Sequence, residues 1–519
     1  MFFCLRVLAI ERRRTTAQTL PKNLYGIKDR QKTKYLRNLE KEYNEKDKTE
    51  SESYKWNYKN NYLKGNAIPS IEYVYETSQK LLPSISIEEV NQLSTELIRS
   101  KNRVIAATSP ENEEMIIPTE EDLKKVLDKV LTMDIDPYVD AVSDEPLVGS
   151  LSPAGKVVTE IKLDDIGITQ WTLSNGIKVV LKPTDFKNDE ILFYAHSPGG
   201  NSLVEDEDFM AAQTATSIIT ESGLANFTKI ELDKLLSDKI VKVSPWLDGL
   251  SEGFEGSVSP QDQETMFQLI YQYFYAPRAD STSFLAYKAR MEGWIENRNA
   301  EPENIFRDSI LVTKTQHHFR ARPWTIEILK EMDLERSFKI FKDRFSDAGD
   351  FTFFFVGNFD LEKIKPAVET YLGSLPTTGR KETWRDVNME MPEGIVENSV
   401  RKGIEPKSMV RIIFNGKFNW NLENQHILES LKGVMEIKLR EIMREDMGGT
   451  YGVWMWTDPI HYPEEKYEFN IMFGCSPENV DTLTQALFTQ IDSLQSYGID
   501  IDYISKVQEK QRQAREVDL

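Results

Sequence analysis

Apolar residues recur at two different spacings along the chain, and together the spacings predict both helices and strands. Near-helical intervals separate the apolar residues of 83–100 and of 427–443, whereas Tyr451, Val453 and Met455 alternate with other residues. An Asn-Gly pair at 175–176 stands between two further alternating runs, which is a strong signal for a β-hairpin. These patterns predict an α+β fold.

The first third of the chain is mainly helical in pattern. Residues 28–66 are highly charged and favour a helix that packs one narrow face, and a second helix is expected within 83–100 after the capping-type residue Ser84. A short apolar strand is expected at 103–107. The acidic turn that opens 119–131 predicts another helix.

A strand followed by a helix occurs twice. The first instance is 103–107 with 119–131, and the second is 351–356 with 361–372. Two lobes that end alike are expected of duplicated α+β units.

Proline and glycine residues lie among acidic residues between 134 and 160, a composition that is typical of an inter-domain linker. A second polar, proline-containing stretch follows residue 385. We therefore expect five parts: the end of a preceding lobe at 1–135, a linker at 136–160, a complete lobe at 161–385, a linker at 386–398 and a last lobe at 399–519.

The segment from Arg444 to Gly452 carries the most informative chemistry. Arg444 closes the helical pattern, Gly448 and Gly449 break it, and Tyr451 opens an alternating run. A guanidinium is a planar fork of donors that suits carbonyl or carboxylate groups, and a phenol can donate to a developing oxyanion. Spacing alone leaves open a second interpretation, in which the helix simply ends and Tyr451 packs in the core.

Four stretches resemble the insulinase (pitrilysin) family of zinc metallopeptidases, in the family's order and over roughly residues 160 to 519. The segment 439–453 is similar to the family's Arg and Tyr substrate-binding segment. The others are an opening strand pair, a hydrophobic strand with its turn, and a stretch that closes a lobe: 171–180, 353–360 and 371–376.

The resemblance implies repeated lobes, each with an antiparallel-rich mixed sheet and packed helices. It also implies that Arg444, Gly448 and Gly449 contact a substrate backbone and that Tyr451 contacts the substrate and donates to the tetrahedral oxyanion. Members hold zinc on an H-x-x-E-H helix with a further glutamate. That motif is absent here, and the corresponding region, 199–223, contains no histidine. Its Glu221 is interpreted as a polar helix end, so Zn²⁺ is expected in the full-length enzyme but not on residues of this chain.

No other motif predicts a metal site. His426 and Glu429 lack a second histidine, and His317 and His318 are adjacent, so they cannot share a helix face. His196 and His461 are isolated. The acidic run 205–208 lacks the alternate-residue spacing of a calcium loop and is expected to be a solvated loop.

Composition excludes several classes of function. The chain has 519 residues and a net charge of −20, which disfavours non-specific binding to nucleic acid or anionic lipid. Cys4 and Cys475 are the only cysteines, too few for a disulfide framework, and Cys475 is expected to be buried and inert. No apolar run is long enough for a membrane span. Trp454 and Trp456 could line a peptide cleft, although core packing is the expectation.

We expect this chain to be the substrate-binding, zinc-free half of a metalloendopeptidase that hydrolyses peptides or small unfolded proteins, and to be inactive alone. Its partners would be a polypeptide substrate and a zinc-bearing N-terminal half. Neither end of the sequence carries an export or terminating signal, so a fragment is expected, and the family resemblance suggests the periplasm. The alternatives are a non-catalytic insulinase-like scaffold or assembly subunit, and a gene fragment without a role of its own.

Overall fold

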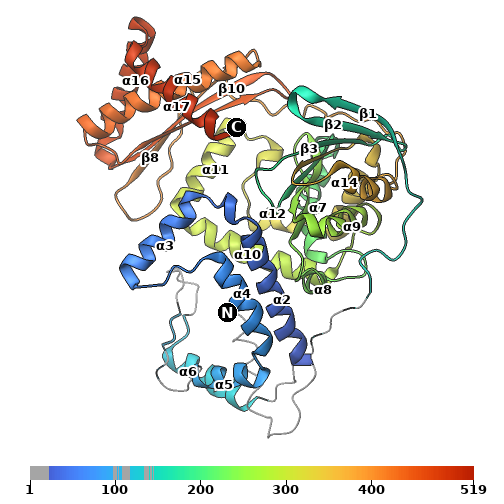
Figure 1. The fold of residues 1–519 in the computed structure, drawn as a ribbon. Coiled ribbons are helices and arrows are strands. Elements are labelled where there is room, and N and C mark those ends of the chain that lie inside the picture. The colour runs from blue at the N-terminus through green and yellow to red at the C-terminus, as the bar shows by residue number, and fades with distance from the viewer. Residues whose placement is uncertain are drawn as a thin grey trace. The chain divides into compact units, whose positions relative to one another are not determined.

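The computed structural model describes residues 23–97, 102, 104–107, 117–133, 140, 143 and 145–518. Its contacts divide the described chain into two compact units. The first unit consists of the described residues up to Ala300 together with Pro323–Val387. The second unit consists of Glu301–Arg322 together with the residues from Asn388 onward. Helices and antiparallel-rich sheets make up both units, which confirms the predicted α+β class (Figure 1).

The first unit contains a seven-stranded sheet in the order β1-β2-β3-β7-β4-β6-β5. All neighbouring strands are antiparallel except β3 and β7, which are parallel. The strands are β1 (Val157–Leu163), β2 (Ile168–Leu173), β3 (Lys178–Pro183), β4 (Ile191–Pro198), β5 (Val241–Leu247), β6 (Ser251–Val258) and β7 (Thr352–Gly357).

The predicted hairpin at 175–176 is confirmed. Strands β2 and β3 pair antiparallel, with Thr172 opposite Lys178, and Gly176 adopts φ +90° at the turn. Glycine suits this position because a side chain at positive φ would be strained.

Alternation along the strands turns one face of this sheet toward three helices. They are α7 (Phe209–Ser222), α9 (Gln263–Tyr275) and α14 (Leu361–Ala367), and Figure 1 shows all three beside the strands. Phe254 lies fully buried at the centre of the core, 4.9 Å from Phe345 and 5.5 Å from Phe274 between ring centroids. The expected strand and helix at 351–356 and 361–372 are present as β7 and as α14 followed by η9 (Val368–Leu372).

The remaining helices of the first unit precede the sheet or cover its helical layer. They are α2 (Asn23–Asn44), α3 (Ser51–Lys64), α4 (Ile71–Leu81), α5 (Ile87–Leu97), α6 (Glu120–Thr132), α8 (Lys229–Leu235), α10 (Ser281–Ala300), α12 (Ile326–Lys330) and α13 (Leu334–Arg344).

Two details of the predicted N-terminal third are wrong. Ser86, not Ser84, caps α5, because the Ser86 hydroxyl accepts from the Glu89 amide at 3.1 Å while the Glu89 carboxylate accepts from the Ser86 amide. Residues 104–107 form no strand, and Arg103 lies outside the described residues. The helix predicted at 119–131 is confirmed as α6, which begins with a capping box between Thr119 and Asp122.

A buried arginine joins α2 to the first sheet. Arg37 donates to the Ser259 hydroxyl at 2.6 Å and to the Asp262 carboxylate at 3.1 Å, and Asp189 lies 3.8 Å away. A buried charge is stable only when it is paired and hydrogen-bonded. The narrow packing face predicted for this charged helix therefore includes a salt bridge as well as the apolar Leu39.

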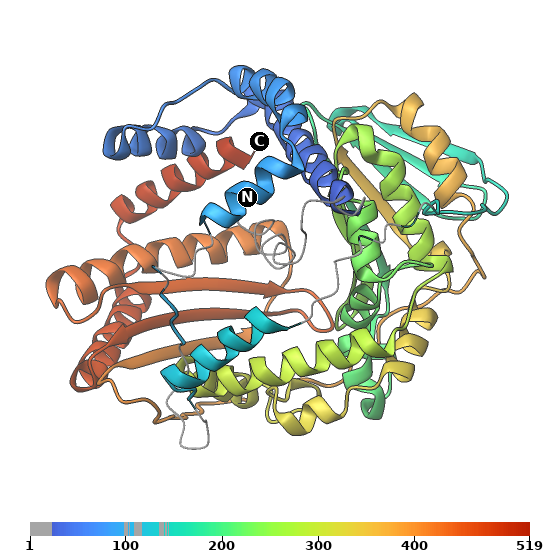
Figure 2. The same ribbon diagram turned by 90° about the horizontal axis from the view of Figure 1, so that it is seen from below.

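The second unit contains a three-stranded antiparallel sheet in the order β8-β10-β9, from β8 (Ser408–Lys417), β9 (Val453–Ile460) and β10 (Lys466–Cys475). One face packs against α15 (Leu422–Leu439) and α16 (Val480–Tyr497), and Figure 2 shows α15, in orange, running along the strands. The α17 helix (Ile501–Asp518) lies against α15. On the other face lies α11 (Pro302–Lys314), which explains why residues 301–322 group with this unit rather than with the surrounding 161–385.

The two units repeat one arrangement. The order β4-α7-β5-β6-α9 in the first matches β8-α15-β9-β10-α16 in the second, and the corresponding strands occupy the same sheet order. The strand between the other two of each set, β6 between β4 and β5 or β10 between β8 and β9, leads into a Ser-Pro pair, a short 3₁₀ turn and a helix, at Ser259–Pro260 and Ser476–Pro477. The residue seven positions before each proline lies opposite a tryptophan on the neighbouring strand: Gly253 opposite Trp246, and Asn470 opposite Trp456. The repeat predicted from the sequence, 103–107 with 119–131 against 351–356 with 361–372, is not the one observed, because 104–107 form no strand; the fold repeats 191–275 in 408–497 instead.

We predict that Phe254→Ala destabilises the first unit by about 3 to 5 kcal/mol, because it leaves a cavity among aromatic rings that cannot collapse. Urea unfolding followed by circular dichroism measures the change. Phe186→Ala removes an exposed ring and serves as the control. Equal stability of the two variants would contradict the assigned centre of the core.

Candidate substrate-binding segment

The Arg444–Gly452 segment begins where α15 changes into a wider helical turn. Residues Arg440–Asp446 form the π-helix η10, so the helix extends slightly beyond its predicted end at Arg444. The Met447 amide donates to the Ile442 carbonyl at 3.0 Å, and the Gly449 amide donates to the Met443 carbonyl at 3.2 Å. Gly448 adopts φ +59° and ends the helix, as the sequence predicted.

Gly449 and Thr450 fix the segment to the body of the second unit. A Cβ on Gly449 would lie 2.8 Å from the Leu483 side chain, so only glycine fits there without a shift. The buried Thr450 hydroxyl donates to the Gly474 carbonyl at 2.7 Å and accepts from the Gly452 amide at 3.2 Å. Because Gly474 lies near the end of β10, these contacts join the turn to the central strand.

Tyr451 follows these two anchoring residues and is 97% exposed. The interpretation of Tyr451 as a core residue is therefore wrong. Arg444 is also exposed, and its Nε lies 3.7 Å from the Glu445 carboxylate. Both side chains that the sequence singled out are available to a ligand, and their contact with a peptide stays a prediction.

Strand β9 separates its side chains onto two faces. Val453 and Met455 pack in the core, while Trp454 and Trp456 lie on the opposite face and Trp454 is 51% exposed. The expectation that both tryptophans pack in the core is wrong. The Arg411 guanidinium lies 4.7 Å from the Trp456 ring centroid, a distance typical of a cation–π contact.

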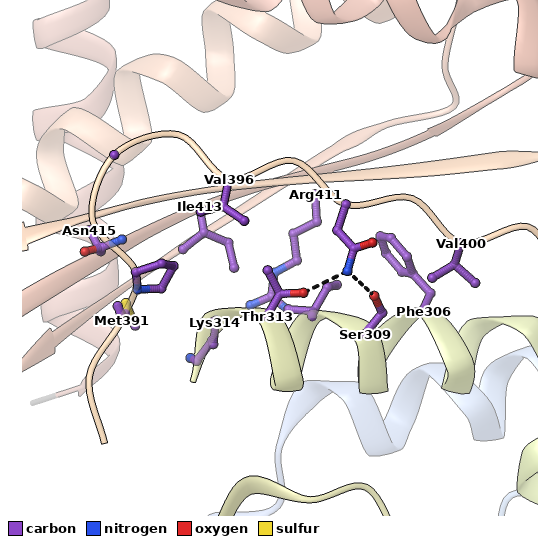
Figure 3. Close-up of a pocket in the computed structure, with 14 residues that line it drawn as sticks. Phe306, Ser309, Thr313, Lys314, Met391, Val396, Val400, Arg411, Ile413 and Asn415 are labelled. Carbon is purple, nitrogen blue, oxygen red and sulfur yellow. Dashed lines mark hydrogen bonds between the residues drawn. The ribbon is translucent and has the colours of Figure 1, made fainter. Parts of the chain in front are cut away.

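A groove that the sequence analysis missed runs over this second face (Figure 3). Figure 3 shows α11 on one side, with Ser309 and Thr313, and β8 on the other, with Arg411. Asn398 crosses between them and donates to the Ser309 and Thr313 hydroxyls at 3.0 and 2.9 Å. Alternation along β8 places Arg411 on this face, but no sequence pattern pairs β8 with α11.

The cations in the groove already have partners inside the unit. Lys314 donates to the buried Glu468 carboxylate at 2.6 Å, and Arg411 donates to the Asn470 side chain at 2.8 Å. Burial lowers the pKa of Arg411, and burial together with Glu468 raises the pKa of Asp458. The groove is therefore a satisfied polar network, and we assign it no ligand.

The described residues contain no group of three or more His, Cys, Asp or Glu side chains that could hold a metal ion. In the region that corresponds to the zinc lobe, α7 is mostly buried and ends as predicted near Glu221, which pairs with Arg290 at 2.6 Å. His426 is exposed, and Glu429 pairs with Lys432. The donor set in the described part of the chain thus does not fit zinc.

The other titratable residues that the sequence singled out also have structural explanations. His317 is exposed, and the His318 Nδ1 accepts from the Arg320 amide at 3.2 Å. His461 stacks on Trp420, with 4.3 Å between the ring centroids.

Burial lowers the pKa of His196. Glu205 pairs with Arg385 at 3.0 Å, and Asp208 pairs with Arg336 at 2.9 Å. Cys475 is half-buried rather than buried, and burial raises the pKa of its thiol; Cys4 lies outside the described residues.

Glu252 on β6 is the buried carboxyl nearest to Gly199 and Gly200. The Gly200 amide donates to its Oε2 at 2.5 Å, and Arg344 lies 3.8 Å from its Oε1. Burial raises the pKa of Glu252 to about 8, although the Gly200 amide and Arg344 act in the opposite direction. Sequence reasoning missed this residue because nothing in the pattern of β6 distinguishes it from an exposed strand carboxylate.

This chain matches known proteins both in sequence and in fold. Residues 333–511 match the domain family described as the Peptidase M16 inactive domain. The resemblance to the insulinase family is confirmed. The zinc protease PQQL-like of Arabidopsis thaliana is 24% identical over 95% of this chain and 51% of its own length.

Solved structures show the same fold. The periplasmic protease PqqL from Escherichia coli matches with a TM-score of 0.65 and 17% identity over 99% of this chain and 56% of its own. The ferredoxin protease FusC, solved in complex with Arabidopsis ferredoxin, matches with a TM-score of 0.65 and 15% identity over the same shares. The chain thus spans about half the length of these three proteins. Among the described residues, no helix has the length and apolar character to cross a membrane.

We predict that Gly449→Ala destabilises the second unit by about 1 to 3 kcal/mol, because the new methyl group overpacks against Leu483. Thermal unfolding measures the loss. Gly452→Ala is the matched control, since its Cβ would have only an ordinary contact, 3.8 Å from Trp454. A larger loss in the control would argue against the anchoring role of Gly449.

We predict that Glu252 makes the first unit less stable as pH rises. Its folded-state pKa of about 8 exceeds the ordinary 4.5, so its contribution is complete below pH 4.5 and is lost as pH rises toward 8. The slope from this group is at most about 1.4 kcal/mol per pH unit. Glu252→Gln should flatten the pH dependence of urea unfolding between these values. Glu255→Gln, on the exposed side of the same strand, should leave it unchanged.

Proposed function

We propose that this chain is the zinc-free, substrate-contacting half of a metalloendopeptidase that cleaves peptides or small unfolded proteins. The observation that carries the proposal is the display of Tyr451, nearly fully exposed, directly after two residues that fix its backbone. Many proteins expose single aromatic side chains. Here the backbone before Tyr451 is held by Gly449 and Thr450 while the Tyr451 side chain is exposed, which suits a group that must contact a ligand at a defined position.

The chemistry of the two side chains supports separate roles. Arg444 would hold a backbone carbonyl or carboxylate through its planar set of donors. Tyr451 would donate its phenolic proton in a hydrogen bond to the oxyanion that forms when the scissile carbonyl becomes tetrahedral. Gly448 would leave space for the substrate backbone beside these groups, because a Cβ there meets nothing within 4 Å. Gly449 would contact the substrate through its backbone, since Leu483 occupies the place of a side chain.

The donor set of the described residues gives no place for the catalytic metal, so this chain would be inactive alone. Zn²⁺, together with the base that activates water, would come from a zinc-bearing N-terminal half. The names of the relatives as zinc proteases support this division of labour. The periplasmic description of the Escherichia coli neighbour supports the periplasm as the compartment. The FusC complex supports a polypeptide as the class of substrate.

We predict that mixing the purified chain with a separately expressed zinc-bearing half restores cleavage of an extended fluorogenic peptide. Tyr451→Phe should then lower kcat about 10²- to 10³-fold with little change in KM, because it removes a donor that acts mainly in the transition state. Arg444→Ala should mainly raise KM. Tyr497→Phe alters another exposed tyrosine of the same unit and should have no effect.

The same experiment separates the peptidase from the scaffold. Tight assembly of the two polypeptides without peptide cleavage would support a non-catalytic subunit. Cleavage that is equal for the wild type and Tyr451→Phe would remove Tyr451 from the proposal, even if the peptidase assignment survived.

A further inference from the structure

Helix α17 is joined to the turn that carries Arg444 by one short hydrogen bond. The Tyr503 hydroxyl donates to the Glu441 carboxylate at 2.6 Å, and both side chains are half-buried. Glu441 lies at the start of the π-helix η10, three residues before Arg444. The bond raises the pKa of Tyr503 to about 12, so its hydroxyl stays protonated and able to donate at neutral pH. Neither Tyr503 nor Glu441 belongs to the proposed substrate contacts.

Other contacts fix the position of Tyr503 beside α15. The buried Val507 packs against Gly433, where an added Cβ would lie 3.1 Å from the Val507 side chain. One turn further along α17, Gln511 donates to the Ser430 hydroxyl at 3.0 Å. Residue numbers thus rise on α17 as they fall on α15. The two helices are therefore antiparallel, and Tyr503 lies at the end of α15 where η10 begins.

The partner of Glu441 is not the one that its spacing predicts. Residues three apart are neighbours on the surface of an α-helix, so Glu441 and Arg444 would form an ion pair in a regular continuation of α15. In the structure the turn is wider, because the Met447 amide donates to the Ile442 carbonyl five residues earlier. The Arg444 Nε lies instead 3.7 Å from the Glu445 carboxylate. Wide turns of this kind are rare and occur often at functional sites.

We propose that Tyr503 is a positioning residue for Arg444: by holding the Glu441 carboxylate it maintains the wide turn of η10 and leaves the guanidinium available to a polypeptide substrate. Without that hydroxyl, the turn would return to α-helical spacing and Glu441 would pair with Arg444. Tyr451 would keep its place, since the two residues before it fix its backbone without Tyr503. The inference rests on the proposed function, because it concerns a residue that would contact the substrate.

The rate at which phenylglyoxal modifies Arg444 in this chain tests the inference without any cleavage. The reagent attacks a neutral guanidinium, and a paired carboxylate favours the charged form. Tyr503→Phe should therefore slow the modification of Arg444 about two- to fivefold relative to Arg401, an exposed arginine of the same unit. Peptide mass spectrometry follows both arginines. In about 1 M salt, where the Debye length is about 3 Å, the difference should shrink.

Three further variants separate this role from a general loosening of the helices. Glu441→Asp keeps the charge but is too short for the bond to Tyr503, so it should slow modification as Tyr503→Phe does. Glu441→Gln removes the competing charge, and adding it to Tyr503→Phe should restore the wild-type rate. Gln511→Ala removes another hydrogen bond between α17 and α15 and should have no effect. Equal rates for the wild type and Tyr503→Phe, or no restoration in the double variant, would overturn the proposal.

The enzyme reconstituted with the zinc-bearing half gives a second readout. Tyr503→Phe should raise KM about two- to fivefold and leave kcat unchanged, because only the contact made by Arg444 is weakened. A fall in kcat with KM unchanged would contradict the inference. If the two halves together cleave nothing, the proposed function fails, and the modification rates of Arg444 still decide the role of Tyr503.

Discussion

Each unit depends on one antiparallel strand pair that turns alternate side chains toward a pair of helices. In the first unit the pair is β4 and β6, with Phe254 at its centre, and in the second it is β8 and β10, with Ile471 at the matching position. The pleat forces the residues between them onto the opposite face. The register of β5 with β6 and of β9 with β10 extends the same alternation to the third strand, where Trp246 and Trp456 face away from the core.

The same constraint places the candidate site at an edge of the second core rather than within it. Helix α15 must lie on the apolar face of the sheet, so the chain has to return from the helix to β9 at the edge of that layer. Two contacts fix this turn to the core: Gly449 packs against Leu483, and the Thr450 hydroxyl donates to the carbonyl of Gly474 on β10. Tyr451 then points into solvent because its neighbours occupy the available space in the core.

Local signals predicted a large part of this architecture. The Asn-Gly turn, the acidic start of α6 and the glycines after α15 each act through the backbone of a few residues, so a single sequence is enough to recognise them. The outward position of Trp454 and Trp456 was less visible. Composition favours burial of tryptophan, whereas the actual face is decided by the register of β9 with β10. The predicted repeat of 351–372 at 103–131 failed because 104–107 form no strand, and the repeat that exists, β4 to α9 with β8 to α16, became visible only through the strand pairing.

Contacts between distant segments account for what the sequence did not predict. The sequence of α11 does not indicate that this helix packs against β8 and not within the predicted lobe 161–385. Its position depends on contacts with distant residues, namely the hydrogen bonds from Asn398 and the ion pair of Lys314 with Glu468. The raised pKa of Glu252 has the same origin, because it comes from burial of the carboxyl by segments that are distant in sequence, against the opposite effect of the Gly200 amide and Arg344.

The two units also differ in how completely they use the repeated arrangement. The first closes its sheet with β7 and buries its aromatic residues. In the second unit β8 pairs only with β10 among the described strands, and its inward residues Val410, Ile412 and Phe414 are half-buried. Tyr451, nearly fully exposed directly after two anchored residues, is the feature of the second unit on which the proposed substrate contact rests.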